Sequence, residues 1–229
     1  MSVGILIQVR MKSQRLLHKA LRPLFGQPLI LRLSERLEST NLPVIWCTSA
    51  FKEDAILSDY AKSYGYECFK GDPENIAQRF IDCMDFYGFD RIVRVTGDNP
   101  LTCPEMIKKM VQTEGGYVYT EGLCSGLRPE VISRKYLKEM VNLEDQEHNF
   151  TGWLKKRGGV CLQEITSSHR LTVDTEDDYR RMVKIYDHYK GTPPSGRDII
   201  KKPFWIPLLD HGPTPSYEHW KRLGCRKSL

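Results

Sequence analysis

Short apolar runs alternate with helical patterns along the first half of the chain. Four runs containing apolar, often β-branched residues predict strands that are buried on both faces of a sheet. They cover residues 3–7, 44–48, 66–69 and 91–96. Apolar residues spaced three or four apart predict intervening helices over residues 29–37, 52–61 and 76–87. Because strands and helices alternate, we expect an α/β fold with a mostly parallel central sheet and helices on both faces.

The alternation becomes irregular after residue 115. Residues 117–119 predict one further strand, and we expect residues 121–168 to form a lobe inserted over the edge of the sheet. Order returns with a predicted strand at residues 171–174. It runs into a predicted helix over residues 176–189, which has an acidic first turn and which Thr175 can cap.

The end of the chain differs from the rest in composition and charge. We expect one domain over residues 1–190, followed by a Pro- and Gly-rich arm over residues 191–229. The whole chain has a net charge of +5, and residues 190–229 account for it with eight Lys or Arg against three Asp or Glu. Nucleic-acid binding usually needs a basic stripe across a folded face, so we expect no nucleic-acid partner.

The cysteines and the apolar segments bear on where the protein works. Seven cysteines form an odd set without a C-x-x-C pair, which predicts reduced thiols in a cytoplasm. No segment reaches the ~18 apolar residues of a membrane span, and the N-terminus shows no basic leader. We therefore expect a cytoplasmic protein with no membrane partner.

A cationic loop follows the first predicted strand. It holds Arg10, Lys12, Arg15 and Lys19. Ligands bind at the carboxyl ends of strands in open α/β sheets, and such cations suit the oxygens of a triphosphate, with backbone amides near Ser13 as further donors. A solvated basic loop fits the same composition, because the loop has neither Walker spacing nor G-x-G-x-x-G.

Two carboxylates, Asp98 and Asp174, directly follow predicted strands. Two carboxylates at strand ends can share one cation, and Mg²⁺ prefers hard oxygen ligands. In the structural alternative, Asp98 lies in a turn and Asp174 caps the helix after it. The cationic loop nearby favours the metal.

These motifs resemble those of the cytidylyltransferases that activate sugars with CTP. The resemblance is strongest to the spore-coat polysaccharide biosynthesis type and extends to the synthetases of CMP-sialic acid and CMP-Kdo. Its segments are IQVRMKSQRL (7–16) with KAL (19–21), FGQPL (25–29), FKG (69–71), RVTGDNPL (94–101), EHNFT (147–151) and RLTVDTED (170–177). It implies a Rossmann-like nucleotide-diphospho-sugar transferase fold of the GT-A type.

The resemblance also implies site residues and a reaction: transfer of CMP from CTP with release of pyrophosphate. The implied nucleotide contacts are Gln8, Arg10, Met11, Ser13, Arg15, Lys19, Ser49, Arg79, Thr96 and Asp98. The implied catalytic residues are Arg15 and Lys19, which hold the leaving pyrophosphate, and Asp98 and Asp174, which hold Mg²⁺. The implied acceptor residues are Gly126, Glu130, Glu147, His148 and Arg170. The first four lie in the lobe, which helps to form a homodimer in relatives.

The chain departs from the family pattern in two places. Leu17-His18 stand where relatives usually have Pro-Gly before the lysine, so the loop loses a glycine and gains bulk. Residues 125–130 match the relatives only loosely, which leaves the acceptor open among sugar acids, sugar phosphates and phosphonates.

Two rival functions remain open at this point. A GT-A glycosyltransferase would use a finished nucleotide sugar, but it normally carries Asp-x-Asp where this chain has Gly97-Asp98-Asn99. A non-catalytic nucleotide-binding protein would be compatible with the altered first loop.

Overall fold

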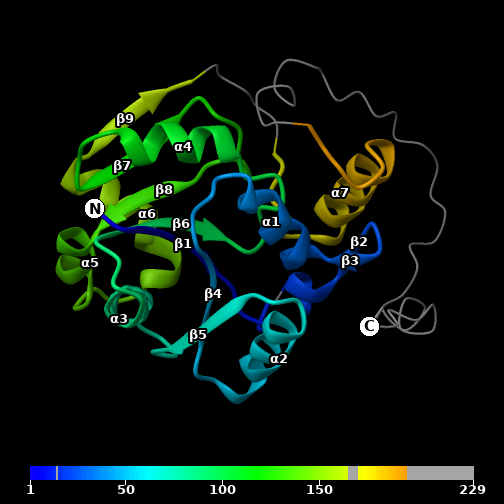
Figure 1. Cartoon of the computed structure of the whole chain (residues 1–229), viewed down its shortest axis with the longest axis horizontal. Helices are drawn as coiled ribbons and strands as arrows, with labels where there is room; N and C mark the ends of the chain where they lie inside the picture. The colour runs from blue at the N-terminus through cyan, green and yellow to red at the C-terminus, as the bar shows by residue number, and fades with distance from the viewer. Residues whose placement is uncertain (14, 165–169, 195–229) are drawn as a thin grey trace.

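The computed structural model describes residues 1–13, 15–164 and 170–194, which fold around one central sheet (Figure 1). Its strands are β1 (Val3–Gln8), β4 (Val44–Ser49), β5 (Glu67–Gly71), β6 (Arg91–Thr96), β7 (Tyr117–Glu121), β8 (Glu130–Ser133) and β9 (Val160–Gln163). Their order is β5-β4-β1-β6-β8-β7-β9, and β8 alone runs against the others. The predicted α/β fold with a mostly parallel sheet is confirmed.

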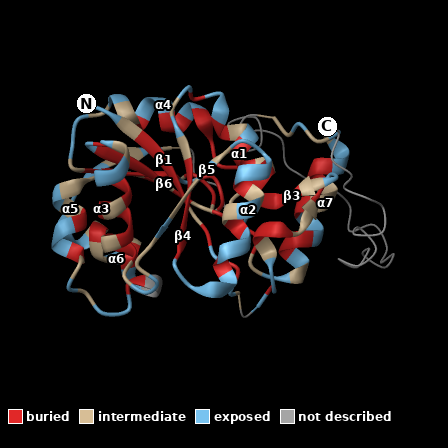
Figure 2. Ribbon diagram, turned by 60° about the horizontal axis from the view of Figure 1, so that its bottom comes forward, coloured by how far each residue is buried: buried red, intermediate tan, exposed pale blue. Residues whose placement is uncertain are grey.

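The central strand β1 explains why the core has two halves. Ile5, Leu6 and Ile7 are fully buried, and alternate residues of a strand point to opposite faces. Ile5 and Ile7 therefore join one hydrophobic cluster, and Leu6 joins the other. Figure 2 shows the buried residues concentrated in the central strands and on the sides of the helices that face them.

Helices cover both faces of the sheet. Buried residues of the Ile5 cluster come from α1 (Leu29–Glu38), α2 (Ala55–Ser63), α4 (Pro104–Gln112) and α7 (Glu176–His188). Those of the Leu6 cluster come from α3 (Ile76–Tyr87), α5 (Arg134–Met140) and α6 (Gln146–Arg157). Short connections complete the fold: the 3₁₀ turns η1 (Lys19–Leu21) and η2 (Lys52–Asp54), and the hairpin β2 (Pro23–Leu24) and β3 (Gln27–Pro28).

Residues 121–168 contribute strands as well as helices. They supply β8, which lies inside the sheet between β6 and β7, and β9, which lies at its edge beside β7. Residues 165–169 and most of the arm, from residue 195 onward, lie outside the described residues.

The predicted strand at residues 171–174 is wrong. Only an isolated bridge joins Ser125 to Arg170, and the residues after it form no ladder. The Leu171 amide donates to the Ser125 carbonyl at 2.7 Å, and the Val173 amide donates to the Asp98 carbonyl at 2.9 Å. Leu171 and Val173 are apolar because they pack into the core from an extended segment that crosses the ends of the strands.

Two further expectations concern thiols and membranes. The cysteines of the described part, which excludes Cys225, are free thiols. Within the same residues, no helix combines the length and the apolar character that crossing a membrane requires.

Candidate active site

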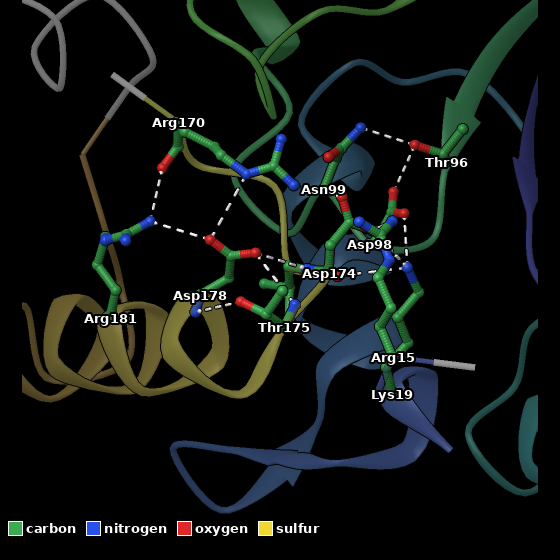
Figure 3. Close-up of polar contacts among 11 residues, drawn as sticks. Arg15, Lys19, Thr96, Asp98, Asn99, Arg170, Asp174, Thr175, Asp178 and Arg181 are labelled. Carbon is green, nitrogen blue, oxygen red and sulfur yellow. Dashed lines mark hydrogen bonds and ion pairs between the residues drawn. The ribbon is translucent and has the colours of Figure 1, made fainter. Parts of the chain in front are cut away.

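Three charged residues from distant parts of the chain meet at the carboxyl end of the sheet (Figure 3). Lys19 begins the turn η1, Asp98 follows β6, and Asp174 precedes α7. Lys19 Nζ lies 2.8 Å from Asp98 Oδ2 and 3.1 Å from Asp174 Oδ1, and it donates to the Val173 carbonyl at 3.3 Å. The structure thus brings together the two predicted metal ligands and one predicted phosphate ligand.

The residues around Asp98 fix its carboxylate. The Thr96 hydroxyl donates to Asp98 Oδ1 at 2.6 Å, and Asn99 Nδ2 donates to the Thr96 hydroxyl at 2.7 Å. Gly97 lets this turn pass close to β1, because a Cβ there would lie 3.1 Å from Val9 Cβ. The short sequence TGDN therefore orients one carboxylate toward the cationic loop.

Asp174 is surrounded by cations. Arg15 Nη2 lies 3.2 Å from Asp174 Oδ1, and the Arg170 guanidinium pairs with Asp174 Oδ2. Burial raises the pKa of Asp174, but the attraction of Lys19, Arg170 and Arg15 outweighs burial and holds this pKa below its usual value. Asp174 is therefore a carboxylate at neutral pH.

The first turn of α7 holds the backbone at Asp174 in place. Asp178 accepts hydrogen bonds from the amides of Asp174 and Thr175, both at 3.1 Å, while the Thr175 hydroxyl accepts from the Asp178 amide. This is a capping box, and it confirms Thr175 as the cap. Arg181 pairs with Asp178 at 3.2 Å. We did not identify Asp178 from the sequence, although the spacing T-x-x-D is a signal that could have revealed it.

A second buried carboxylate, Asp54, holds the loop after β1. It is 1% exposed, and it accepts from the Met11 amide at 2.6 Å and from the Ser49 hydroxyl. These bonds tie the predicted nucleotide contacts Met11 and Ser49 to each other across the end of β4. No sequence motif points to Asp54, because its role depends on partners five and 43 residues away.

Other predicted nucleotide contacts lie along the same end of the sheet. Arg79 is buried, donates to the carbonyls of Asp72 and Pro73 at 2.8 and 3.0 Å, and thus fixes the turn before α3. Burial lowers the pKa of Arg79. Gln8 Oε1 accepts from Arg94 Nε at 2.8 Å, and the Ser13 hydroxyl accepts from the Leu16 amide at 3.4 Å.

A cavity of about 230 Å³ opens beside Asp98. Its lining comprises Arg94, Thr96, Asn99, Tyr119, Thr120, Arg128, Pro129, Glu130, Thr151 and Lys155. Glu130, a predicted acceptor residue, is buried there with the Arg94 guanidinium and the Tyr117 hydroxyl on its two oxygens. Among the described residues, Asn99 Oδ1 and Thr120 Oγ1 are buried with no hydrogen-bond partner, so the cavity wall holds polar atoms that a ligand can satisfy.

The remaining predicted acceptor residues are dispersed. Arg170 binds Asp174 and therefore belongs to the carboxylate cluster. Gly126 has a φ of +97°, and a Cβ there would lie 2.3 Å from the Leu171 carbonyl carbon, so this glycine allows two backbone segments to touch. Glu147 and His148 lie on α6, but their side chains are outside the described part, and their roles stay predictions.

The carboxylates of Asp98 and Asp174 suit a divalent cation whose other ligands are phosphate oxygens and water. Within the described residues, no group of three or more His, Cys, Asp or Glu could hold a metal ion. Mg²⁺ commonly takes one or two protein carboxylates and completes its shell with phosphate oxygens and water. The Lys19 ammonium, held between Asp98 and Asp174, shows that this position attracts a cation.

Comparison with known proteins places the chain in a family. The family model described as cytidylyltransferase matches residues 4–190. The spore coat polysaccharide biosynthesis protein SpsF of Bacillus subtilis is 28% identical over 235 residues, which cover 93% of this chain and 96% of that protein.

Solved structures agree with this placement. A cytidylyltransferase from Leptospira borgpetersenii superposes with a TM-score of 0.79 at 26% identity, covering 88% of this chain and 93% of the other. A CMP:2-keto-3-deoxy-manno-octonic acid synthetase complexed with CTP shares the fold, with a TM-score of 0.65 at 14% identity and coverage of 82% and 100%. The chain belongs to the cytidylyltransferase family of nucleotidyltransferases.

Proposed function

We propose that this protein transfers CMP from CTP to an anionic sugar-type acceptor and releases pyrophosphate. The observation that supports this most is the convergence of Lys19 and Arg15 on Asp98 and Asp174, next to a polar cavity whose lining includes Thr96 and Asn99. The synthetase complexed with CTP, which shares the fold, supports CTP as the nucleotide.

The cationic loop binds the triphosphate. Arg15 is 65% exposed, so its guanidinium can turn from Asp174 to the phosphate oxygens at little cost in burial. Lys19 lies on a buried turn and supplies a second charge from a fixed backbone. Together these two cations offset the charge that develops on the leaving pyrophosphate.

Asp98 and Asp174 are the residues that hold Mg²⁺. When bound, the ion neutralises charge on the α-phosphate. Thr96 keeps the Asp98 carboxylate aimed at the site, and the capping box of α7 keeps Asp174 in place. Both carboxylates are about four-fifths buried, so solvent screens their charges only partly.

The cavity beside Asp98 receives the acceptor. The lining holds three cations, Arg94, Arg128 and Lys155, and one carboxylate, Glu130, so it carries a net positive charge. A sugar acid, sugar phosphate or phosphonate supplies the matching anion. The unpartnered oxygens of Asn99 and Thr120 suit the hydroxyls of a sugar.

The chemistry needs no covalent enzyme intermediate. An acceptor oxygen attacks the α-phosphorus of CTP, the bond from this phosphorus to the bridging oxygen breaks, and pyrophosphate leaves. The protein contributes positioning and charge stabilisation, which account for most catalysis of phosphoryl transfer.

A GT-A glycosyltransferase is the second candidate. Its usual second aspartate is missing here, because Thr96 and Pro100 stand two residues to either side of Asp98, and the Asn99 amide nitrogen donates to the Thr96 hydroxyl. This donor arrangement favours the nucleotidyltransferase. Surface-glycan biosynthesis and a homodimer accompany the proposal as expectations drawn from the family resemblance. A cytoplasmic location accompanies it as the expectation drawn from the cysteines.

Pyrophosphate release tests this function. CTP, UTP, GTP and ATP are each supplied with Mg²⁺ and with pooled sugar acids, sugar phosphates and phosphonates. We expect release with CTP and one pool. Nucleoside diphosphate release from a nucleotide sugar, with no pyrophosphate from any triphosphate, would instead establish the glycosyltransferase.

A further inference from the structure

We infer that Lys19 is an internal counterion that keeps a free divalent cation off Asp98 and Asp174 until a nucleoside triphosphate draws the ammonium away. The metal then binds with the nucleotide and not before it. This inference rests on the proposed function, because the triphosphate and the cation are the ligands of that same site.

The first argument is steric and electrostatic. Lys19 Nζ lies 2.8 Å from Asp98 Oδ2 and 3.1 Å from Asp174 Oδ1. Mg²⁺ binds carboxylate oxygens at about 2.0–2.1 Å, so an ion held by these same two oxygens would overlap the ammonium. Two positive charges at that separation also repel strongly in a partly buried site.

The second argument comes from the other carboxylate oxygens. Asp98 Oδ1 accepts from the Thr96 hydroxyl, and Asp174 Oδ2 accepts from Arg170. Every oxygen of the two carboxylates therefore has a donor. A metal ion therefore competes with donors that are already in place, and Lys19 is the donor that contacts both carboxylates.

The third argument concerns the freedom of Lys19. Its backbone is fixed in η1, where the Arg22 amide donates to the Lys19 carbonyl and the neighbours Ala20 and Leu21 are buried. His18 stands before it with a φ of +53°. The backbone is thus held in place while the long side chain can rotate, so the ammonium can exchange carboxylate oxygens for phosphate oxygens without refolding the loop.

Binding of the cation and of the triphosphate must then be coupled. Each ligand relieves a contact that opposes the other, and linkage makes the effect reciprocal. Removing the ammonium leaves two carboxylates facing each other, which favours a free divalent cation. We expect Lys19→Met to bind Mn²⁺ without nucleotide about tenfold or more tightly than the wild type, within the usual range of such coupling.

Mn²⁺ titration followed by electron paramagnetic resonance measures this without turnover, because free hexaaqua Mn²⁺ gives a signal that bound Mn²⁺ loses. The wild type, Lys19→Met and Lys19→Arg are titrated with and without CTP, and a titration of CTP without protein corrects for the Mn²⁺ that CTP itself binds. Lys19→Arg keeps the charge and should behave like the wild type. Lys138→Met, on the exposed side of α5, removes the same charge away from the site and should not change Mn²⁺ affinity.

The outcomes separate the inference from the proposed function. The inference is supported if, without CTP, Lys19→Met binds Mn²⁺ tightly, while the wild type binds Mn²⁺ only when CTP is present. Equal binding to wild type and Lys19→Met without CTP overturns it and leaves the metal site standing. Binding to neither protein, even with CTP, overturns both. Lys19→Gln, which keeps hydrogen bonds without charge, replaces Lys19→Met if circular dichroism shows that variant unfolded.

Discussion

At the scale of single residues, the site is a balance of charges in which each carboxylate has a defined task. Asp98 is held by Thr96 on one oxygen and by Lys19 on the other. In the proposed function, nucleotide affinity depends on several cations of the loop, whereas the metal depends on two carboxylates. Loss of one carboxylate should therefore affect chemistry more than binding.

Asp98→Ala should lower turnover by about 100-fold or more while CTP affinity changes by only about threefold, because a lost charge-stabilising group costs mainly the transition state. Steady-state pyrophosphate release and calorimetric titration with CTP measure the two effects. The matched control is Asp85→Ala, which removes an exposed carboxylate of α3 that pairs with Arg134 of α5. Wild-type turnover in Asp98→Ala would remove Asp98 from the metal site.

His18 stands at the position where the family resemblance leads us to expect a glycine. Its φ of +53° is a left-handed conformation that Gly adopts freely and that a β-branched residue strongly resists. We expect His18→Gly to stay within about 0.5 kcal/mol of the wild type, since relief of strain offsets the added freedom of the unfolded chain.

The matched variant His18→Val should lose about 1–2 kcal/mol of unfolding free energy, because a branched Cβ adds to the strain that His already bears in that conformation. Because Lys19 follows directly, His18→Val should also raise the KM for CTP. Urea denaturation and initial rates measure both effects. Equal stability of the two variants would mean that the backbone conformation at His18 is not under constraint.

At the scale of elements, the segment before α7 depends on a close backbone contact. Gly126 touches the backbone of Leu171 and Thr172, and the Leu171 amide donates to Ser125. This contact places Asp174 opposite Asp98. The short loop around Gly126 thereby controls the distance between two carboxylates that come from different elements.

Gly126→Ala should destabilise the protein by about 3 kcal/mol, because strain at a positive φ adds to a clash with rigid backbone. Gly152→Ala, on α6 with no atom near the added Cβ, should be neutral or slightly stabilising. Thermal and urea unfolding of both variants test this. A Gly126→Ala protein as stable as the wild type would show that the contact is not required.

The sequence predicted best those elements in which the spacing of apolar residues matches a single buried face or a fully buried strand. The bounds of α3 and β6 agree with the prediction, because Phe80 and Met84 form one buried stripe and Ile92 and Val93 are buried on both faces. The strand prediction for residues 171–174 was wrong because apolar residues also occur in extended segments that pack into the core without forming a β-ladder. Periodicity could not reveal that β8 enters the middle of the sheet, since strand order depends on contacts distant in sequence.

At the scale of the whole molecule, the fold explains why the candidate site could be predicted in part. Arg15, Lys19 and Asp98 follow strands whose carboxyl ends lie at the same edge of the sheet, so local sequence was enough to place them together. Asp174 was placed there through a predicted strand that does not form, and the segment that leads into α7 brings it to this edge instead. Asp54, Asp178 and the cavity lining around Thr120 were missed. Their roles come from hydrogen bonds and burial that only the folded chain creates.

The central claim is attack on the α-phosphorus of CTP, and the fate of labelled phosphate tests it most directly. CTP labelled at either the α- or the γ-phosphorus is incubated with the protein, Mg²⁺ and the active acceptor pool, and the products are separated. We expect the α-label in a CMP-acceptor conjugate and the γ-label in pyrophosphate. A γ-label in inorganic phosphate or on the acceptor, with the α-label left in CDP, would contradict the nucleotidyltransferase.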